Sequence, residues 1–188
     1  MLVNFGVISS EKYDEIARSA DFLRNESEKW SSSNPTQNNL AKQLAMYSAG
    51  RSAVFLSGTD FSPVAYKWKI SWNENAKNVA FWNEYPEFNH NEFIGWSSHP
   101  VEKLFAIFNI RSDFDHPRVQ KRFEISDRLL SGKRPTARNI DLKGATPLEQ
   151  MLWGSILADF VSIYLAILNN QNPTPVDLIE KLKIELVK

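Results

Sequence analysis

The chain has 188 residues, the length of one ordinary domain, and 43% of them are hydrophobic, enough to build a core. Its 22 basic and 22 acidic residues give zero formal charge, which favours neither nucleic acid nor an anionic membrane as a partner. The chain contains no cysteine, which excludes disulfides, cysteine-based zinc sites and a cysteine nucleophile.

The N-terminal residues and the longest apolar run also limit the class of protein. The N-terminus has no basic leader and no small-residue cleavage site, so no signal peptide is expected. The longest apolar run, residues 151–168, carries Asp159 and is short for a membrane span, so it predicts a buried helix. We therefore expect a soluble, cytoplasmic domain.

The helical spacing of apolar residues predicts six helices. In chain order they cover about residues 9–23, 35–48, 61–76, 117–130, 147–168 and 175 onwards. Asn34 is expected to cap the second helix and Gly50 to end it. Thr146 is expected to cap the fifth helix in a capping box with Glu149, and Thr174 to cap the last by the same logic.

Three short apolar runs, at residues 52–56, 79–82 and 104–110, predict buried strands. Strands that alternate with helices favour an α/β fold, in which a parallel sheet is covered on both faces. Residues 131–146 are expected to form an exposed loop with four solvated basic side chains, a phosphate contact being the less favoured alternative. These side chains are Lys133, Arg134, Arg138 and Lys143.

Residues 73–96 bring carboxylates, amides and His90 together with aromatic side chains. Such polar groups lie either on the surface or in a desolvated site, where burial raises the pKa of a carboxylate towards that of a general base. A metal site is less favoured, because Glu87 and His90 are three residues apart but a second such pair is missing. Gly58 stands alone, so no glycine-rich phosphate loop is predicted.

The same stretch resembles the bifunctional phosphoglucose/phosphomannose isomerases of the sugar isomerase (SIS) superfamily. The resemblance rests on residues 73–77 (Asn-Glu-Asn-Ala-Lys) and 86–92 (Pro-Glu-Phe-Asn-His-Asn-Glu), and the tail 172–176 (Asn-Pro-Thr-Pro-Val) fits as well. It extends from about residue 35 to 186. It implies that residues 1–188 form a single SIS-like domain, a three-layer αβα sandwich with a mainly parallel sheet.

In that family each subunit has two SIS domains, and these motifs belong to the second. The first carries a loop of the type Ser-Gly-Asn-Thr-Glu-Glu that holds the substrate phosphate. Residues 57–60 (Ser-Gly-Thr-Asp) are the nearest string here, at a different place in the family order. The resemblance therefore implies the C-terminal half of an enzyme whose partners are the missing N-terminal SIS domain and, in a homodimer, a second subunit.

The family reaction interconverts glucose 6-phosphate, and mannose 6-phosphate, with fructose 6-phosphate through a cis-enediol, in glycolysis and gluconeogenesis and without metal or organic cofactor. By resemblance Glu74 is the base that moves a proton between C1 and C2. His90 assists ring opening in the site of a neighbouring subunit, and Asn89 beside it binds substrate.

A lysine near the C-terminus acts at the ring oxygen or O5 in this family, and two candidates remain open. Lys183 matches the family's Leu-Lys tail, whereas Lys181 lies seven residues after Thr174. Thr174 resembles the small residue associated with accepting both epimers, although a role as helix cap explains it equally well.

A non-catalytic SIS module for dimerisation or sugar-phosphate binding is the alternative function. A phosphosugar-sensing regulator is less favoured, because such domains need the phosphate loop that the sequence lacks. The aromatic residues of the 81–96 stretch are expected at or near a subunit interface, where aromatic side chains are enriched.

Overall fold

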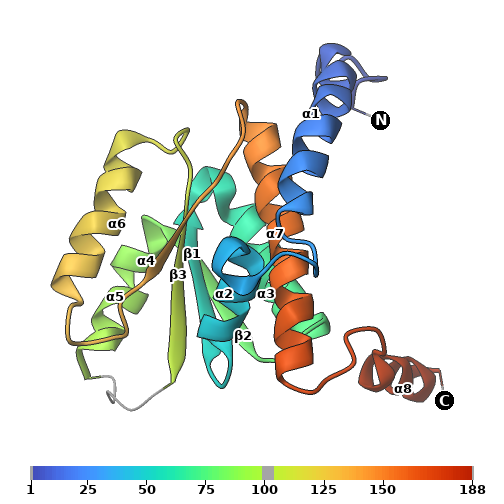
Figure 1. Cartoon of the computed structure of the whole chain (residues 1–188). Helices are drawn as coiled ribbons and strands as arrows, with labels where there is room; N and C mark the ends of the chain where they lie inside the picture. Colours follow the sequence, from blue (N-terminus) through green and yellow to red (C-terminus); the bar gives the residue numbers. More distant parts are fainter. Residues whose placement is uncertain (1, 99–103, 188) are drawn as a thin grey trace.

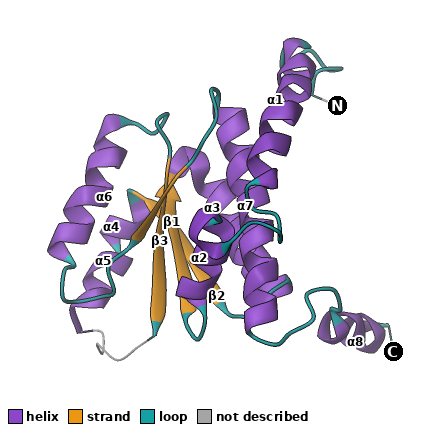
Figure 2. Cartoon of the chain, viewed as in Figure 1, coloured by secondary structure: helices purple, strands orange, loops and turns teal. Residues whose placement is uncertain are grey.

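The computed structural model describes residues 2–98 and 104–187 and shows an α/β fold with one central sheet (Figures 1 and 2). The sheet has the order β2-β1-β3-β4, and every neighbouring pair is parallel. The strands are β1 (Ser52–Gly58), β2 (Ala80–Tyr85), β3 (Phe105–Arg111) and β4 (Arg138–Asp141). This architecture confirms the predicted fold class.

Helices cover both faces of the sheet, as Figure 2 shows. One layer holds α1 (Glu11–Glu28), α2 (Leu40–Ser48), α3 (Ser62–Glu74) and α7 (Pro147–Leu168). The other holds α4 (Glu87–His90), α5 (Glu92–Gly95) and α6 (Pro117–Leu129). Short 3-10 helices occupy Thr36–Asn38, Thr59–Phe61 and Trp96–Ser98. The last helix, α8 (Asp177–Leu186), stands apart from the layered body (Figure 1).

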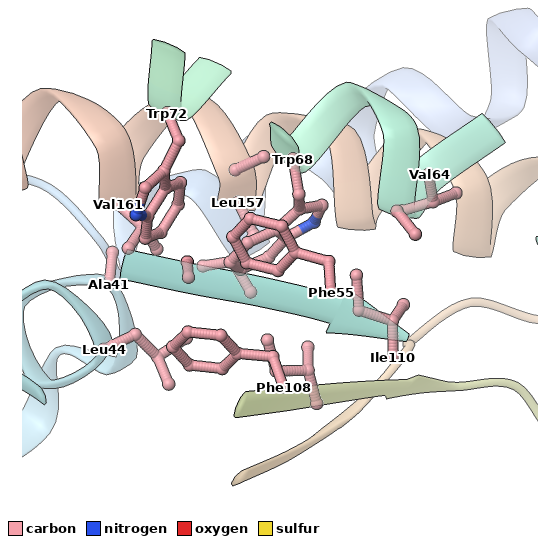
Figure 3. Close-up of a cluster of buried hydrophobic side chains, with 14 of the residues drawn as sticks. Ala41, Leu44, Phe55, Val64, Trp68, Trp72, Phe108, Ile110, Leu157 and Val161 are labelled. Atoms are coloured by element: carbon pink, nitrogen blue, oxygen red, sulfur yellow. The ribbon is translucent and has the colours of Figure 1, made fainter. Parts of the chain in front are cut away.

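The larger core lies between the sheet and the layer that contains α3 and α7. Phe55 on β1 packs against Trp72 on α3, with ring centroids 5.0 Å apart, and stacks on Phe108 of β3 at 5.4 Å (Figure 3). Trp68 is fully buried beside them, and its indole N–H donates to the backbone oxygen of Gly154 on α7 at 2.9 Å. The aromatic rings thus fasten α3 to the sheet and to α7.

The smaller core lies on the opposite face. Tyr85, Phe88 and Trp96 are buried in it, and the Tyr85 and Phe123 rings lie 4.6 Å apart. These three aromatic residues come from the stretch expected at a subunit interface, but they belong to the domain's own core. Phe81 and Trp82, in the same stretch, are 53% and 37% exposed.

Helix α7 meets, by length and composition, the criteria for a helix that could cross a membrane. A core helix meets them equally, and α7 packs against α1, α2 and α3. Its residues Trp153, Leu157 and Val161 are buried in the larger core. The prediction of a buried helix is confirmed.

The prediction of an exposed loop at residues 131–146 was wrong in two respects. Residues 138–141 form β4, which pairs with β3 in the register Ile110↔Ile140. Arg134 is not solvated: it is buried and forms an ion pair with Asp127 at 2.8 Å. Within β4 only Ile140 is both apolar and buried, so a four-residue edge strand leaves no apolar run for the sequence to show.

The start of the second helix was also misplaced. Asn39, not Asn34, caps α2, and its side-chain oxygen accepts from the backbone N–H of Lys42 at 3.1 Å. The residues just before it form a 3-10 turn instead of the first turn of an α-helix. The expected cap of α7 is present, with Thr146 accepting from the N–H of Glu149 at 3.2 Å.

The close approach of Gly58 to Asp115 gives a stability prediction. A Cβ at position 58 would lie 2.0 Å from Oδ1 of Asp115 and 3.0 Å from Cγ1 of Val119. We expect Gly58→Ala to lower the free energy of unfolding by about 1–3 kcal/mol, because a buried carboxylate and a packed helix must move. Urea denaturation measures this loss. Gly95→Ala is the control, with no atom within 4 Å, and should change stability by less than about 0.5 kcal/mol.

Candidate active site

Glu74, the predicted base, is the last residue of α3 and faces an open groove of about 540 Å³. Helix α3 starts at the carboxyl end of β1 and runs back, so Glu74 lies at the amino end of the sheet, before β2 begins. The other wall of the groove is the loop that follows α7, together with the first turn of α8. The residues that line it are Asn73, Glu74, Lys77, Gln171, Asn172, Pro175, Val176, Asp177, Leu178 and Ile179.

The neighbours of Glu74 in the 73–77 motif hold the end of α3 in place. The Asn73 side chain donates to the backbone oxygen of Asn78 at 2.9 Å, and that of Asn75 donates to Ser162 on α7 at 2.9 Å. Ala76 is fully buried. The Glu74 side chain itself is exposed, and its carboxylate makes no hydrogen bond or ion pair within residues 2–98 and 104–187. The motif thus fixes the backbone around a carboxylate that stays free.

Lys77 joins the two walls of the groove. Its backbone has a positive φ of 52°, an uncommon conformation for a residue other than glycine. Its ammonium donates to the backbone oxygen of Glu74 and, at 3.2 Å, to that of Pro173. This role could not be predicted from the sequence, because no spacing indicates that residues 77 and 173 meet.

His90 and Asn89 lie on α4, in the layer opposite to that of Glu74. The Asn89 amide is engaged at both ends: it donates to Ser126 at 2.9 Å and accepts from Arg122 at 3.0 Å. His90 is exposed. Because α4 follows the carboxyl end of β2, a strand of roughly 16 Å and the sheet itself separate His90 from Glu74. One chain therefore does not bring these two predicted site residues together.

The C-terminal candidates lie beyond the groove. Helix α8 begins at Asp177 with Val176 at its cap position and no side-chain cap, so the role of Thr174 as helix cap was wrong. The exposed Thr174 sits in the loop beside the groove, where its N–H donates to the Asn172 side chain at 3.0 Å. The two lysines, Lys181 and Lys183, are exposed on α8, and neither lines the groove.

Strand order reverses between β1 and β3, and ligands of α/β sheets usually bind at the carboxyl ends of such strands. A small cavity of about 150 Å³ lies beside the end of β3, and its lining includes Arg111, Asp113 and Glu124. The buried carboxylate of Asp115 fills the space against Gly58 and accepts from the N–H of Ser112 at 3.0 Å. Burial raises the pKa of Asp115, the hydrogen bond from Ser112 opposes the rise, and the charge of Asp60 adds to it. A buried carboxyl group beside residues 57–60 disfavours the binding of a phosphate there, because both groups are acidic.

No three His, Asp or Glu residues of the described chain are grouped to hold a metal ion.

The proteins to which this chain is similar agree with its α/β fold. The family described as "Bacterial phospho-glucose isomerase C-terminal SIS domain" matches residues 37–186. The chain belongs to this family. Among curated relatives, the bifunctional phosphoglucose/phosphomannose isomerase of Caldicellulosiruptor bescii is 32% identical over an alignment of 191 residues, which covers 100% of this chain and 56% of that protein. The Aquifex aeolicus protein of the same name is 33% identical over 147 residues, 78% of this chain and 46% of that protein.

Solved structures show the same fold. A glucose-6-phosphate isomerase like protein from Thermus thermophilus superposes with a TM-score of 0.71 at 20% identity, over 89% of this chain and 55% of that one. The C-terminal domain of a glucosamine-fructose-6-phosphate aminotransferase from Francisella tularensis gives 0.63 at 12% identity, over 86% and 46%. The chain thus spans about half the length of the relatives that it matches.

The link made by Lys77 can be tested directly. Lys77→Met keeps most of the side-chain length but removes the donors that join residue 173 to the end of α3. We expect amide hydrogens of residues 169–176 to exchange about tenfold faster, as local opening becomes easier, with a loss of global stability of only about 1 kcal/mol. Hydrogen-exchange mass spectrometry measures both. Lys133→Met, at an exposed lysine without a side-chain partner among the described residues, should leave the exchange unchanged.

Proposed function

We propose that this chain is the C-terminal half of an isomerase that interconverts glucose 6-phosphate and mannose 6-phosphate with fructose 6-phosphate through a cis-enediol. One observation carries the proposal: the family motif holds the free carboxylate of Glu74 at the rim of an open groove. The groove is open, and the chain spans about half the length of its relatives. We infer that a further domain supplies the remaining walls of the groove.

Glu74 is the base that moves a proton between C1 and C2 of the sugar. Its side chain is exposed to solvent in this chain. Docking of an N-terminal SIS domain over the groove would exclude water from around Glu74, so that the carboxylate and the sugar meet in a desolvated site. The same domain would hold the phosphate, which fixes C1 and C2 against the carboxylate.

His90 acts in ring opening, in the site of a second subunit. Its exposure and its position in the layer opposite to Glu74 support a role outside its own chain's groove. Asn89 belongs to the same proposal, and its bonds to Ser126 and Arg122 favour fixing α4 over direct contact with substrate.

A lysine of α8 completes the set by acting at the ring oxygen or O5. Lys183 and Lys181 both remain candidates. Lys183 forms an ion pair with Glu180 at 2.8 Å, and an ion pair on the exposed surface contributes little to stability. We assign to Thr174 the contact with the substrate near C2, where the two epimers differ; its position in the loop beside the groove supports this role. The proposal places the enzyme in the cytoplasm, in glycolysis and gluconeogenesis.

The second candidate is a non-catalytic SIS module that dimerises or binds sugar phosphates. The acidic group at the carboxyl end of β1 favours the dimerisation form of this candidate, because the buried Asp115 beside Gly58 disfavours a phosphate there. Activity separates the two functions. We expect the 188-residue chain alone to show little or no isomerisation of fructose 6-phosphate, and a fusion to the N-terminal SIS domain of a relative to be active.

In that fusion, Glu74→Gln should lower kcat by about 10²–10⁴-fold, because the amide keeps the size of the side chain but cannot take a proton. A coupled assay for glucose 6-phosphate measures the change. Asp177→Asn removes another acid from the same groove and should leave kcat within about threefold. Near-normal turnover of a folded Glu74→Gln enzyme would show that the base is elsewhere, with Glu84 and Glu87 the next carboxylates to replace.

A further inference from the structure

The position of His90 depends on the backbone of α4. His90 is exposed, and its imidazole forms no hydrogen bond or ion pair within residues 2–98 and 104–187. Helix α4 has only four residues and no side-chain cap, and so short a helix is not stable in water by itself. Contacts with other elements must therefore fix α4 and, with it, the place of His90.

One of these contacts is made by a buried charge. Helices α4, α5 and α6 lie on the same side of the sheet (Figure 1), and the side chain of Arg134, only 2% exposed, is buried among them. Its Cζ atom lies 5.6 Å from the centre of the Phe88 ring on α4 and 5.8 Å from that of Trp96, which follows α5. A cation over an aromatic ring is attracted to it, most strongly where water is excluded. The guanidinium thus attracts both ends of the segment 88–96.

Arg134 is itself fixed at its guanidinium and at its backbone. Its Nη2 donates to Oδ1 of Asp127 on α6 at 2.8 Å, and Oδ2 of Asp127 accepts from the Asn109 side chain on β3 at 2.9 Å. After α6 the chain turns back at Gly132, which has a φ of 75°. The backbone N–H of Arg134 then donates to the oxygen of Leu130 at 3.3 Å. The guanidinium therefore connects α4 to α6 and to the sheet.

An arginine suits this position better than a lysine. The plane of a guanidinium presents its N–H donors to a carboxylate, while its flat face contacts aromatic rings. An ammonium would pair with Asp127 but has no flat face and is more strongly hydrated. Other polar contacts of α4 come from Asn89, whose bond from Arg122 lies on the exposed surface. Arg134 therefore acts on α4 from the interior of the domain.

We propose that Arg134 is a positioning residue for His90. Its ion pair with Asp127 and its contact with Phe88, two residues before His90, fix α4 relative to the sheet and so fix the imidazole. Acid–base catalysis needs the imidazole within hydrogen-bond reach of the sugar oxygen, and a shift of about 1 Å costs about 10²-fold in rate. The effect on ring opening rests on the proposed function, whereas the placement of α4 by Arg134 does not.

Arg134→Met in the 188-residue chain tests the placement. Methionine keeps much of the apolar volume but removes the charge and every donor. We expect amide hydrogens of residues 87–96 to exchange about tenfold faster, and the NMR signals of the His90 imidazole to shift and broaden. The signals of His116, at the start of α6, should stay unchanged. Arg134→Lys, which keeps the charge, should give a smaller effect of the same kind.

Arg138→Met is the matched control. The Arg138 guanidinium also lies over an aromatic ring, that of Tyr47 at 4.5 Å, but Tyr47 packs against Phe108 of the larger core, on the opposite face of the sheet. The substitution should change neither the exchange of residues 87–96 nor the His90 signals. Far-UV circular dichroism should show that all the variants fold.

Turnover by the fusion with an N-terminal SIS domain separates a positioning role from a structural one. Arg134→Met should lower kcat for glucose 6-phosphate about 10–100-fold. Turnover of 5-deoxyfructose 6-phosphate, an open-chain ketose that lacks the hydroxyl for ring closure, should stay within about threefold. In a His90→Ala background, Arg134→Met should lower kcat for glucose 6-phosphate no further, because the effects of residues that act through one another do not add.

A folded Arg134→Met chain with unchanged exchange at residues 87–96 and unchanged His90 signals would overturn the proposal. Equal losses of turnover with the two sugars, or losses that add to those of His90→Ala, would also overturn it, because a general structural defect acts on both sugars alike. If Arg134→Met does not fold, Arg134→Lys takes its place under the same criteria. If the unsubstituted fusion shows no isomerase activity, the proposed function fails, while the exchange and the His90 signals still decide whether Arg134 places α4.

Discussion

Burial of β1 on both faces is the constraint on which the rest of the structure depends. Along this strand Ala53 and Phe55 enter the larger core, while Val54 and Leu56 enter the smaller one. Each face must therefore be closed by helices. Helix α3 packs against the sheet through the aromatic cluster around Phe55, and it therefore runs back from the carboxyl end of β1 to the amino end. Glu74 ends up at the amino edge because this packing decides where α3 runs.

The two ends of the sheet differ in consequence. At the carboxyl end of β1 the buried Asp115 lies against Gly58, where a ligand binds in many α/β proteins, and an acid there disfavours a phosphate. At the amino end the groove beside Glu74 stays open, and Lys77 fixes its two walls against each other. This division agrees with the proposal that the chain supplies a base and leaves phosphate binding to another domain.

The sequence was informative wherever burial leaves a pattern. The apolar runs of β1 and β3 and the Thr146 cap of α7 are local signals, and each was confirmed. β4 was missed because an edge strand buries little, and the start of α8 was misplaced because Val176 caps without a side-chain bond. The groove could not be predicted, since it depends on contact between residues almost a hundred positions apart, such as Lys77 and Pro173. The family motif marked Glu74 and His90 but not their separation by the sheet.

The central claim is that sugar phosphate binds at the amino edge, beside Glu74. The most direct measurement is an NMR titration of the isotope-labelled chain with fructose 6-phosphate, following backbone amide shifts. The account predicts weak binding, with shifts that concentrate at residues 73–77 and 171–179. Shifts confined to residues 57–60 and 112–116, at the carboxyl end of β1 and β3, would contradict it.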